Sequence, residues 1–287
     1  MLNETTPIDQ RHGAARDPSH PPPGAAADWT VPQNWEELTG EEHDVWDLLF
    51  ARQQKALAGR AVRAFEQGLD VLRIDHPGIP EFGELNERLN ARTGWTVVAV
   101  PGLVPEDVFF EHLSKRRFPA GNFIRKRSQL DYLEEPDVFH DVFGHVPLLA
   151  QPEVADFMQR LGELGLAGMN MGALKRIARL YWYTVEFGLA RESGRTRIYG
   201  AGIVSSFGES RFALESPEPH RLAFDLRRVL CTDYKTDSFQ KSYFVMPSLE
   251  DVLRVIERQD VLALCRELEG FPDIDPGTVG AADRLAA

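Results

Sequence analysis

Glu186 lies in the middle of a segment, Leu180–Leu189, that is apolar on nearly every side of a helix. Such a helix is buried, and a buried carboxylate that stays ionised without a partner costs on the order of several kcal/mol or more. The fold must therefore bring a cation to this carboxylate. A salt bridge with Arg179 or Lys175 would meet the requirement, and so would ligation of a metal ion.

Two histidines, His140 and His145, lie five positions apart. On an ideal helix that spacing separates the two side chains by about 140°, whereas a spacing of four would place both on one face. Pro136 suits a first helical position, Gly144 suits the left-handed residue that ends a helix, and Pro147 prevents the helix from resuming. We therefore expect His140 inside a short helix and His145 just beyond its end, turned back toward the site at Gly144.

Two imidazoles and one carboxylate form the ligand set of a mononuclear non-haem iron(II) site with open coordination positions. His140, His145 and Glu186 together therefore predict an oxygenase. A metal-dependent phosphohydrolase is a rival interpretation because Asp141 follows His140, but such a site needs further histidine and aspartate ligands and a cationic pocket. A binding protein with structural zinc is a second rival, although structural zinc prefers four ligands that usually include cysteine.

Composition narrows the class of protein. The chain has 287 residues, of which 43% are hydrophobic, enough for one large core. The net charge of −12 disfavours DNA or RNA as a partner. Cys231 and Cys265 form no CxxC pair, so we expect two buried thiols. An apolar stretch of membrane-spanning length and a signal peptide are both missing from the sequence, so we expect no membrane partner and a cytoplasmic location.

Periodicity and end signals predict a mostly α-helical catalytic domain with small β pieces. We expect a disordered or loosely docked tail over residues 1–27, the domain over 28–270 and a C-terminal tail over 271–287. A doubly wound nucleotide-binding fold is disfavoured because βαβ alternation and GxGxxG are not found in the sequence. The expected elements are a helix capped by Thr39, helices over 61–69 and 80–94, a strand over 95–100, a helix from Pro105, a hairpin or irregular β segment over 195–214, a strand over 243–246 and a helix through Val255.

Several long blocks of this chain closely resemble one known family, the pterin-dependent aromatic amino acid hydroxylases, and within it the bacterial phenylalanine 4-monooxygenases. The resemblance extends over about Trp35 to Met246. The blocks are 102–105, 135–148, 181–189, 199–209 and 239–241.

The resemblance implies roles for particular positions. His140, His145 and Glu186 match the iron ligands, which are also the catalytic centre. The positions that match the pterin site are Gly102, Val104, Phe109, Asp141, Ala178 and Tyr181. The positions that match the substrate site are Arg125, Pro136, Asp137, Trp182, Gly202, Ser205 and Ser206. Arg125 is implied to bind the amino acid carboxylate, and one of the serines to orient a ligand histidine.

The implied activity is hydroxylation of L-phenylalanine to L-tyrosine with O2, using Fe(II) and a tetrahydropterin such as tetrahydrobiopterin. Tryptophan hydroxylation within the same family is the alternative. The small-molecule partners are then L-phenylalanine, O2 and the reduced pterin. The N-terminal segment is too short for the regulatory domain of animal members, and the segment after Gly270 shows no heptads, so we expect a monomer.

Overall fold

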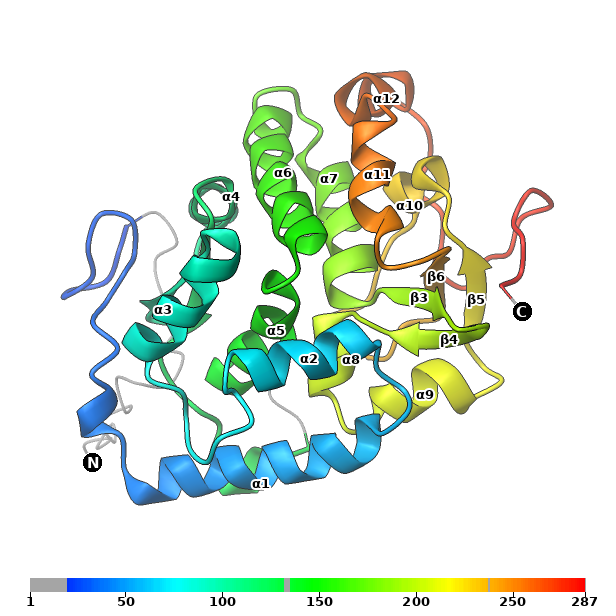
Figure 1. Ribbon diagram of the computed structural model, residues 1–287. Helices are drawn as coiled ribbons and strands as arrows, with labels where there is room; N and C mark the ends of the chain where they lie inside the picture. The colour runs from blue at the N-terminus through cyan, green and yellow to red at the C-terminus, as the bar shows by residue number, and fades with distance from the viewer. Residues whose placement is uncertain (1–19, 132–134, 237, 287) are drawn as a thin grey trace, which may run out of the picture.

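Helices make up about half of the computed structural model, which describes residues 20–131, 135–236 and 238–286 (Figure 1). The expected fold class, mostly α with small β pieces, is confirmed. The α-helices are α1 (Gly40–Leu57), α2 (Arg63–Val71), α3 (Phe82–Thr93), α4 (Glu106–Ser114), α5 (Val146–Leu149), α6 (Pro152–Met169), α7 (Leu174–Tyr181), α8 (Ala201–Ser205), α9 (Glu209–Glu215), α10 (Leu226–Cys231), α11 (Asp251–Glu257) and α12 (Val261–Glu267).

The other elements are short. The strands are β1 (Thr96–Val100), β2 (Arg117–Gly121), β3 (Leu189–Glu192), β4 (Arg195–Ile198), β5 (His220–Ala223) and β6 (Ser242–Met246). Single 3-10 turns occur at Trp35–Glu37 and Arg127–Gln129, and two π-helices occur at Phe139–His145 and Trp182–Glu186. Within the described part of the chain, no helix has both the length and the apolar character needed to cross a membrane.

The ends of the first helices follow the local signals in the sequence. Thr39 accepts a hydrogen bond from the backbone of Glu42, whose carboxylate accepts one from the backbone of Thr39, so the expected cap is present as a complete capping box. Helix α3 ends at Gly94 in the left-handed conformation with φ 75°. The predicted strand over 95–100 and the helix after Pro105 are confirmed by β1 and α4.

The β segment predicted over residues 195–214 is only partly correct. Strand β4 pairs antiparallel with β3 as a hairpin, but the chain turns helical after Gly200 and forms α8 and α9. A Cβ at Gly200 would lie 2.4 Å from the carbonyl oxygen of Glu186. Gly200 and Gly202 therefore permit close packing against the end of the second π-helix, and they are not hairpin turn residues.

Two glycines of the long helix α6 allow α4 to pack closely against it. Gly162 and Gly165 are three apart on one face, and a Cβ on them would lie 2.3 Å from the backbone nitrogen of Ser114 and 2.3 Å from the ring of Phe110. Helices α7 and α11 stand beside α6 in the upper part of Figure 1, and α1 runs along the bottom. The four-stranded sheet, in the order β4-β3-β6-β5, lies on the opposite side of α7 from α4.

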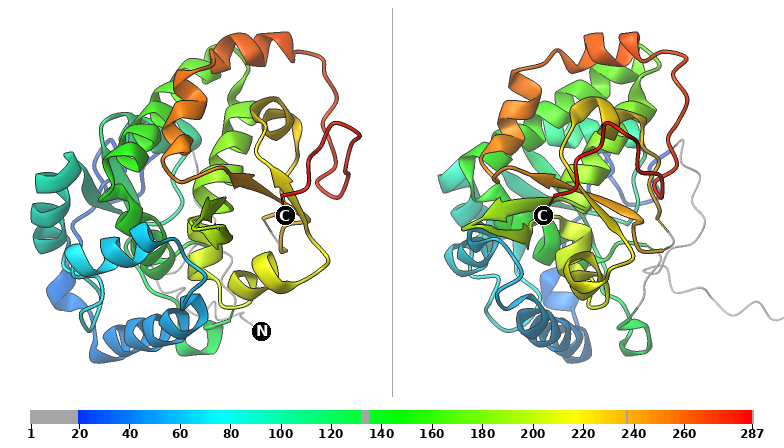
Figure 2. Two further views of the ribbon diagram at one scale, coloured as in Figure 1. Left: turned by 45° about the vertical axis from the view of Figure 1, so that its right-hand side comes forward. Right: turned by 90° about the vertical axis from the view of Figure 1, so that its right-hand side faces the viewer.

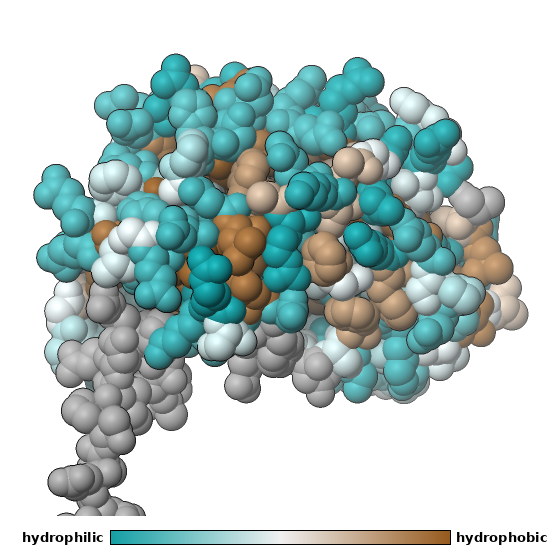
Figure 3. All heavy atoms as spheres, turned by 90° about the horizontal axis from the view of Figure 1, so that it is seen from below, coloured by the Kyte–Doolittle hydropathy of each residue, from teal (hydrophilic) through white to brown (hydrophobic). Residues whose placement is uncertain are grey.

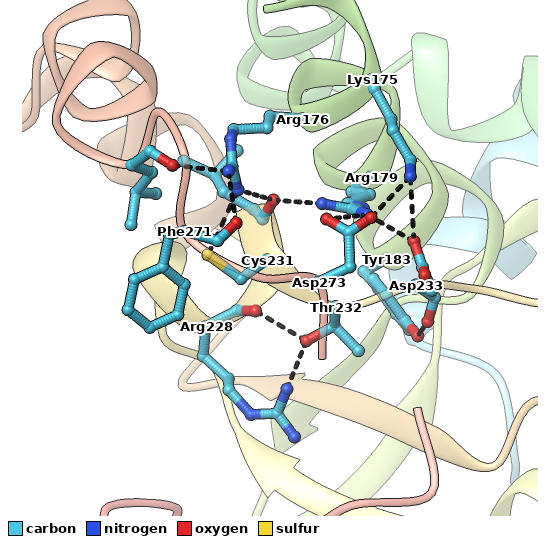
Figure 4. Close-up of polar contacts among 12 residues, drawn as sticks. Lys175, Arg176, Arg179, Tyr183, Arg228, Cys231, Thr232, Asp233, Phe271 and Asp273 are labelled. Carbon is cyan, nitrogen blue, oxygen red and sulfur yellow. Dashed lines mark hydrogen bonds and ion pairs between the residues drawn. The ribbon is translucent and has the colours of Figure 1, made fainter. Parts of the chain in front are cut away.

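Residues 271–286 run from α12 back to the sheet (Figure 2). Ile274 forms a bridge with Thr232, and Leu285 forms one with Leu222 on β5. Asp273 accepts from both Arg179 and Lys175, as Figure 4 shows. The predicted domain limits stay a prediction, and residues 1–19 of the predicted tail lie outside the described residues. Cys231 and Cys265 are both buried and unbridged, as expected.

Candidate active site

The two histidines share a π-helix, and the predicted helix end at Gly144 is wrong. Gly144 is not among the glycines with positive φ, and the chain continues with right-handed dihedral angles through Val146 into α5, which contains Pro147. A π-helix closes hydrogen bonds between residues five apart, so side chains at that spacing lie near one another without a break in the helix. The two Nε2 atoms of His140 and His145 are 3.3 Å apart.

Glu186 comes from the second π-helix, which continues α7. Its carboxylate oxygens lie 3.0 Å from Nε2 of His145 and 3.7 Å from Nε2 of His140. One ligand atom from each of the three residues fits within a cluster in which all separations are below 4.8 Å. The expected convergence is therefore present, and it leaves room for a metal ion between the three side chains.

Salt bridges from Arg179 or Lys175 to Glu186 are contradicted by the structure. Arg179 pairs with Asp233 and Asp273, and Lys175 pairs with Asp273 (Figure 4). Burial by itself would raise the pKa of Glu186, but the neighbouring imidazoles of His145 and His140 hold that pKa well below its usual range. Burial likewise opposes protonation of His140, but Glu186 outweighs it and raises the pKa of His140 to about 8. The carboxylate is therefore ionised and depends on the imidazoles or a metal ion for its partner.

A hydrogen-bond chain sets the tautomer of His140. The hydroxyl of Ser205 donates to the carbonyl oxygen of Ala201 at 2.8 Å, so it accepts from Nδ1 of His140, which lies 2.9 Å away. The lone pair on Nε2 of His140 is then directed at the cluster. Two imidazole nitrogens and one carboxylate suit iron(II) with open coordination positions, so the residues present fit that metal.

A cavity of about 720 Å³ opens beside this cluster. All three members of the cluster line it, and so do almost all the other predicted site residues. Those residues are Gly102, Val104, Phe109, Arg125, Pro136, Asp141, Ala178, Tyr181, Trp182, Gly202, Ser205 and Ser206. The exception is Asp137, which lies beneath Arg125 and is fully buried.

Asp137 holds Arg125 by a two-pronged ion pair. Nε and Nη2 of Arg125 donate to the two carboxylate oxygens at 2.8 and 2.9 Å, and the backbone of His140 donates to the same carboxylate at 3.0 Å. Burial would raise the pKa of Asp137, but the Arg125 guanidinium keeps it below its usual range. The pair fixes the guanidinium in the cavity wall and links it to the start of the first π-helix.

Two aromatic residues and a carboxyl group form part of the cavity wall. The rings of Phe109 and Tyr181 meet edge to face with centroids 5.3 Å apart. Asp141 accepts from the backbone of Gly121 at 2.7 Å, and burial raises the pKa of Asp141 to about 6. Flat apolar surface next to a carboxyl of this kind suits a flat heterocycle that carries N–H donors.

Trp182 forms another part of the cavity wall and has two aromatic neighbours. Its ring stacks with Tyr234 at 4.6 Å and with Phe187 at 5.6 Å, measured between centroids. A Cβ on Gly202 would lie 3.0 Å from a carboxylate oxygen of Glu186, so the absence of a side chain there keeps the space beside the cluster open.

Sequence reasoning missed several residues of the cavity wall, among them Phe118 and Glu209. The ring of Phe118 packs on His145 with centroids 4.7 Å apart, and no local signal identifies it because β2 looks like any short buried strand. Glu209 is buried and accepts from the hydroxyl of Tyr243 at 2.7 Å, and burial raises its pKa to about 7. Its neighbours Gly208 and Ser210 are those of a surface turn, so burial could not be inferred.

The family model for biopterin-dependent aromatic amino acid hydroxylases matches residues 30–267. This chain belongs to that family. It is 54% identical over 265 residues to a phenylalanine-4-hydroxylase of Caulobacter vibrioides, which covers 92% of this chain and 90% of that protein. It is 50% identical to one of Ralstonia nicotianae, covering 90% of this chain and 82% of that protein.

Solved structures of the hydroxylase family extend the likeness to three dimensions. The iron- and phenylalanine-bound phenylalanine hydroxylase of Chromobacterium violaceum superposes with a TM-score of 0.86 at 45% identity, covering 91% of this chain and 95% of that one. A structure of the same enzyme with iron(III) and 7,8-dihydrobiopterin gives 0.86 at 47% identity, covering 90% and 93%.

Proposed function

We propose that this chain is a phenylalanine 4-monooxygenase that uses iron(II), a tetrahydropterin and O2 to convert L-phenylalanine into L-tyrosine. The observation that carries the proposal is the meeting of His140, His145 and Glu186 at the wall of one large cavity. The relatives with half or more of their residues identical bear the name phenylalanine-4-hydroxylase.

In this proposal His140, His145 and Glu186 hold the iron. When bound with the reduced pterin, iron supplies the activation of O2. Ser205 keeps the Nδ1 proton of His140 in place, so that Nε2 stays available to the metal. Tyr181 lies 3.4 Å from Glu186, and burial raises the pKa of its phenol, so it remains a neutral donor.

We assign the pterin to the end of the cavity bounded by Gly102, Val104, Phe109, Ala178 and Tyr181. Phe109 offers a ring face, and Asp141 offers acceptors for N–H groups, directly or through water. The edge-to-face contact with Tyr181 supports this assignment because it limits rotation of the Phe109 ring.

We assign the amino acid to the end near Arg125 and Trp182. Three N–H groups of Arg125, two on Nη1 and one on Nη2, remain for a substrate carboxylate. The N–H of Nε and the second N–H of Nη2 are already bonded to Asp137. Trp182, Pro136 and Gly202 then surround the aromatic ring next to the metal cluster, and Ser206 lies on the same wall. Asp137 acts through Arg125 in this arrangement and does not touch the substrate.

One assay tests the proposed activity against its alternatives. The protein is loaded with iron anaerobically and supplied with a synthetic tetrahydropterin, O2 and phenylalanine, tryptophan or tyrosine in turn. We expect the highest rate of hydroxylated product from phenylalanine. A higher rate with tryptophan would reassign the substrate within the family, and pterin-independent phosphate ester cleavage without hydroxylation would favour the phosphohydrolase interpretation.

A monomeric state and a cytoplasmic location belong to the same proposal. In the face shown in Figure 3, apolar side chains gather in small groups separated by hydrophilic ones, which supports a surface without a broad apolar interface there. Sedimentation at several protein concentrations tests the monomer, and a mass that rises with concentration would contradict it.

A further inference from the structure

His145 lines a second, much smaller cavity in addition to the large one. This small cavity has a volume of about 20 Å³ and lies among α5, α6, α8 and α11. Most of its wall is apolar. The lining residues are Gly144, His145, Leu148, Val154, Phe157, Met158, Val185, Tyr199, Ala201 and Val252.

Two polar atoms on residues of this wall are buried without a hydrogen-bond partner among the described residues. They are Nδ1 of His145 and the hydroxyl oxygen of Tyr199. Both side chains are almost completely buried, and burial raises the pKa of Tyr199, so its hydroxyl stays protonated. Buried polar groups in native proteins are nearly always satisfied by protein or by ordered water.

Metal ligation would require a hydrogen-bond acceptor at Nδ1 of His145. If Nε2 binds the metal, Nδ1 carries the proton and needs an acceptor, which metal-bound histidines almost always have. His140 has such an acceptor in Ser205. His145 has none in the described residues, although it has the shorter contact with Glu186.

We propose that the small cavity holds one water molecule, which accepts from Nδ1 of His145 and hydrogen bonds to the hydroxyl of Tyr199. The cavity is large enough for one water molecule. A buried water needs at least two polar partners, and Nδ1 of His145 and the hydroxyl of Tyr199 are two such groups. Tyr199 is then a positioning residue: through the water it fixes the tautomer and ring orientation of His145. This inference rests on the proposed iron site.

The position of Tyr199 is itself set by the segment that carries Glu186. A Cβ on Gly188 would lie 2.1 Å from the Cζ atom of Tyr199, so Gly188 makes room for the tyrosine ring. The backbone of Tyr199 donates to the carbonyl oxygen of Gly188 at 3.1 Å. The segment that carries the proposed ligand Glu186 therefore also positions Tyr199, the residue that supports His145 through the water.

The test compares Tyr199→Phe with Tyr183→Phe. Both changes remove one buried hydroxyl, but the hydroxyl of Tyr183 donates to the backbone of Asp233, away from the small cavity. The dissociation constant for Fe(II) is measured anaerobically by competition with a chromophoric chelator, and the wild-type protein is crystallised to a resolution that shows ordered water.

We expect Tyr199→Phe to weaken Fe(II) binding about ten-fold, Tyr183→Phe to leave it at the wild-type value, and the wild-type crystal to show a water bonded to both His145 and Tyr199. Equal Fe(II) affinity in Tyr199→Phe and wild type, or a dry cavity in the crystal, would overturn the inference. Failure of the wild-type protein to bind Fe(II) would instead contradict the proposed function, and the crystal would still decide whether the water is present.

Discussion

At the scale of single residues, Arg125 is the side chain whose proposed role is most directly testable. Arg125→Lys keeps the positive charge beside the fully buried Asp137 but loses the planar fork. We expect the KM for phenylalanine to rise about ten-fold or more, because a charged hydrogen bond contributes about 1.5–3 kcal/mol, while the KM for the pterin changes little. Arg127→Lys on the adjacent turn is the control, and equal effects on both KM values would remove Arg125 from carboxylate binding.

Glu186 carries the prediction about the metal. Glu186→Gln preserves the shape of the side chain but removes the charge, so we expect iron bound per protein to fall sharply and hydroxylation to be lost. Glu209→Gln changes another buried carboxyl of the cavity wall and should retain iron. Iron content and turnover at the wild-type level in Glu186→Gln would exclude this residue from the site.

Glu209 predicts a pH dependence of stability. Its pKa is raised by burial from 4.5 to about 7, with Tyr243 bonded to it and Glu186 adding like charge. The folded state therefore binds this proton more tightly than the unfolded state, so ionisation opposes folding. The penalty is absent below about pH 4.5 and complete above about pH 7.

This rise in pKa corresponds to about 3 kcal/mol. The free energy of unfolding of Glu209→Gln, relative to that of the wild type, should therefore increase by roughly that amount as the pH rises from 4.5 to 8. Urea denaturation of both proteins across this range measures the difference. A difference that does not change with pH would show that the carboxyl ionises without penalty.

At the scale of elements, the first π-helix depends on close contact with α8. A Cβ on Gly144 would lie 3.0 Å from the carbonyl oxygen of Ala201 and 3.2 Å from its Cβ. Gly144→Val should therefore push α8 away from the π-helix and lower iron stoichiometry, although it changes no ligand. Gly40→Val is the matched control, since nothing lies within 4 Å of a Cβ there; unchanged iron content in Gly144→Val would show that the contact is not needed.

The elements also show which features of the fold can be predicted from local sequence signals and which cannot. End signals located α1, α3 and α4 because Thr39, Gly94 and Pro105 act on their own neighbours. The spacing of five between His140 and His145 showed that a regular α-helix would not serve. A π-helix and a broken helix both satisfy that spacing, and the choice between them depends on packing against α8, which no local pattern contains.

At the scale of the whole molecule, the Arg179 network ties α7 to the C-terminal segment. The Arg179 side chain is fully buried, whereas its partners Asp233 and Asp273 are partly exposed (Figure 4). Loss of the guanidinium leaves carboxylates that water can still reach, so the effect should be smaller than for a fully buried pair.

We expect Arg179→Leu to lower the free energy of unfolding by about 2 kcal/mol, measured by urea denaturation of the metal-free protein. The exposed pair of Arg160 with Glu163 provides a control, and Arg160→Leu should change stability by less than about 0.5 kcal/mol. Equal effects of the two substitutions would mean that burial of Arg179 adds nothing.

The sequence by itself determined the helical class, the positions of a few helix ends, and the need for a partner at Glu186, because propensity, capping and the burial of an apolar segment are local properties. The chemistry of His140, His145 and Glu186 indicated the metal ligands, and the resemblance of its blocks to a family supplied the pterin and substrate residues. Only the tertiary structure decided that the histidines share a π-helix, that residues 201–215 are helical, that Asp137 lies beneath Arg125, and that Glu209 is buried. These outcomes depend on contacts that local sequence patterns do not contain. At Gly144, Gly200 and Gly202, for example, the absence of a side chain lets other segments approach within distances that a Cβ would forbid.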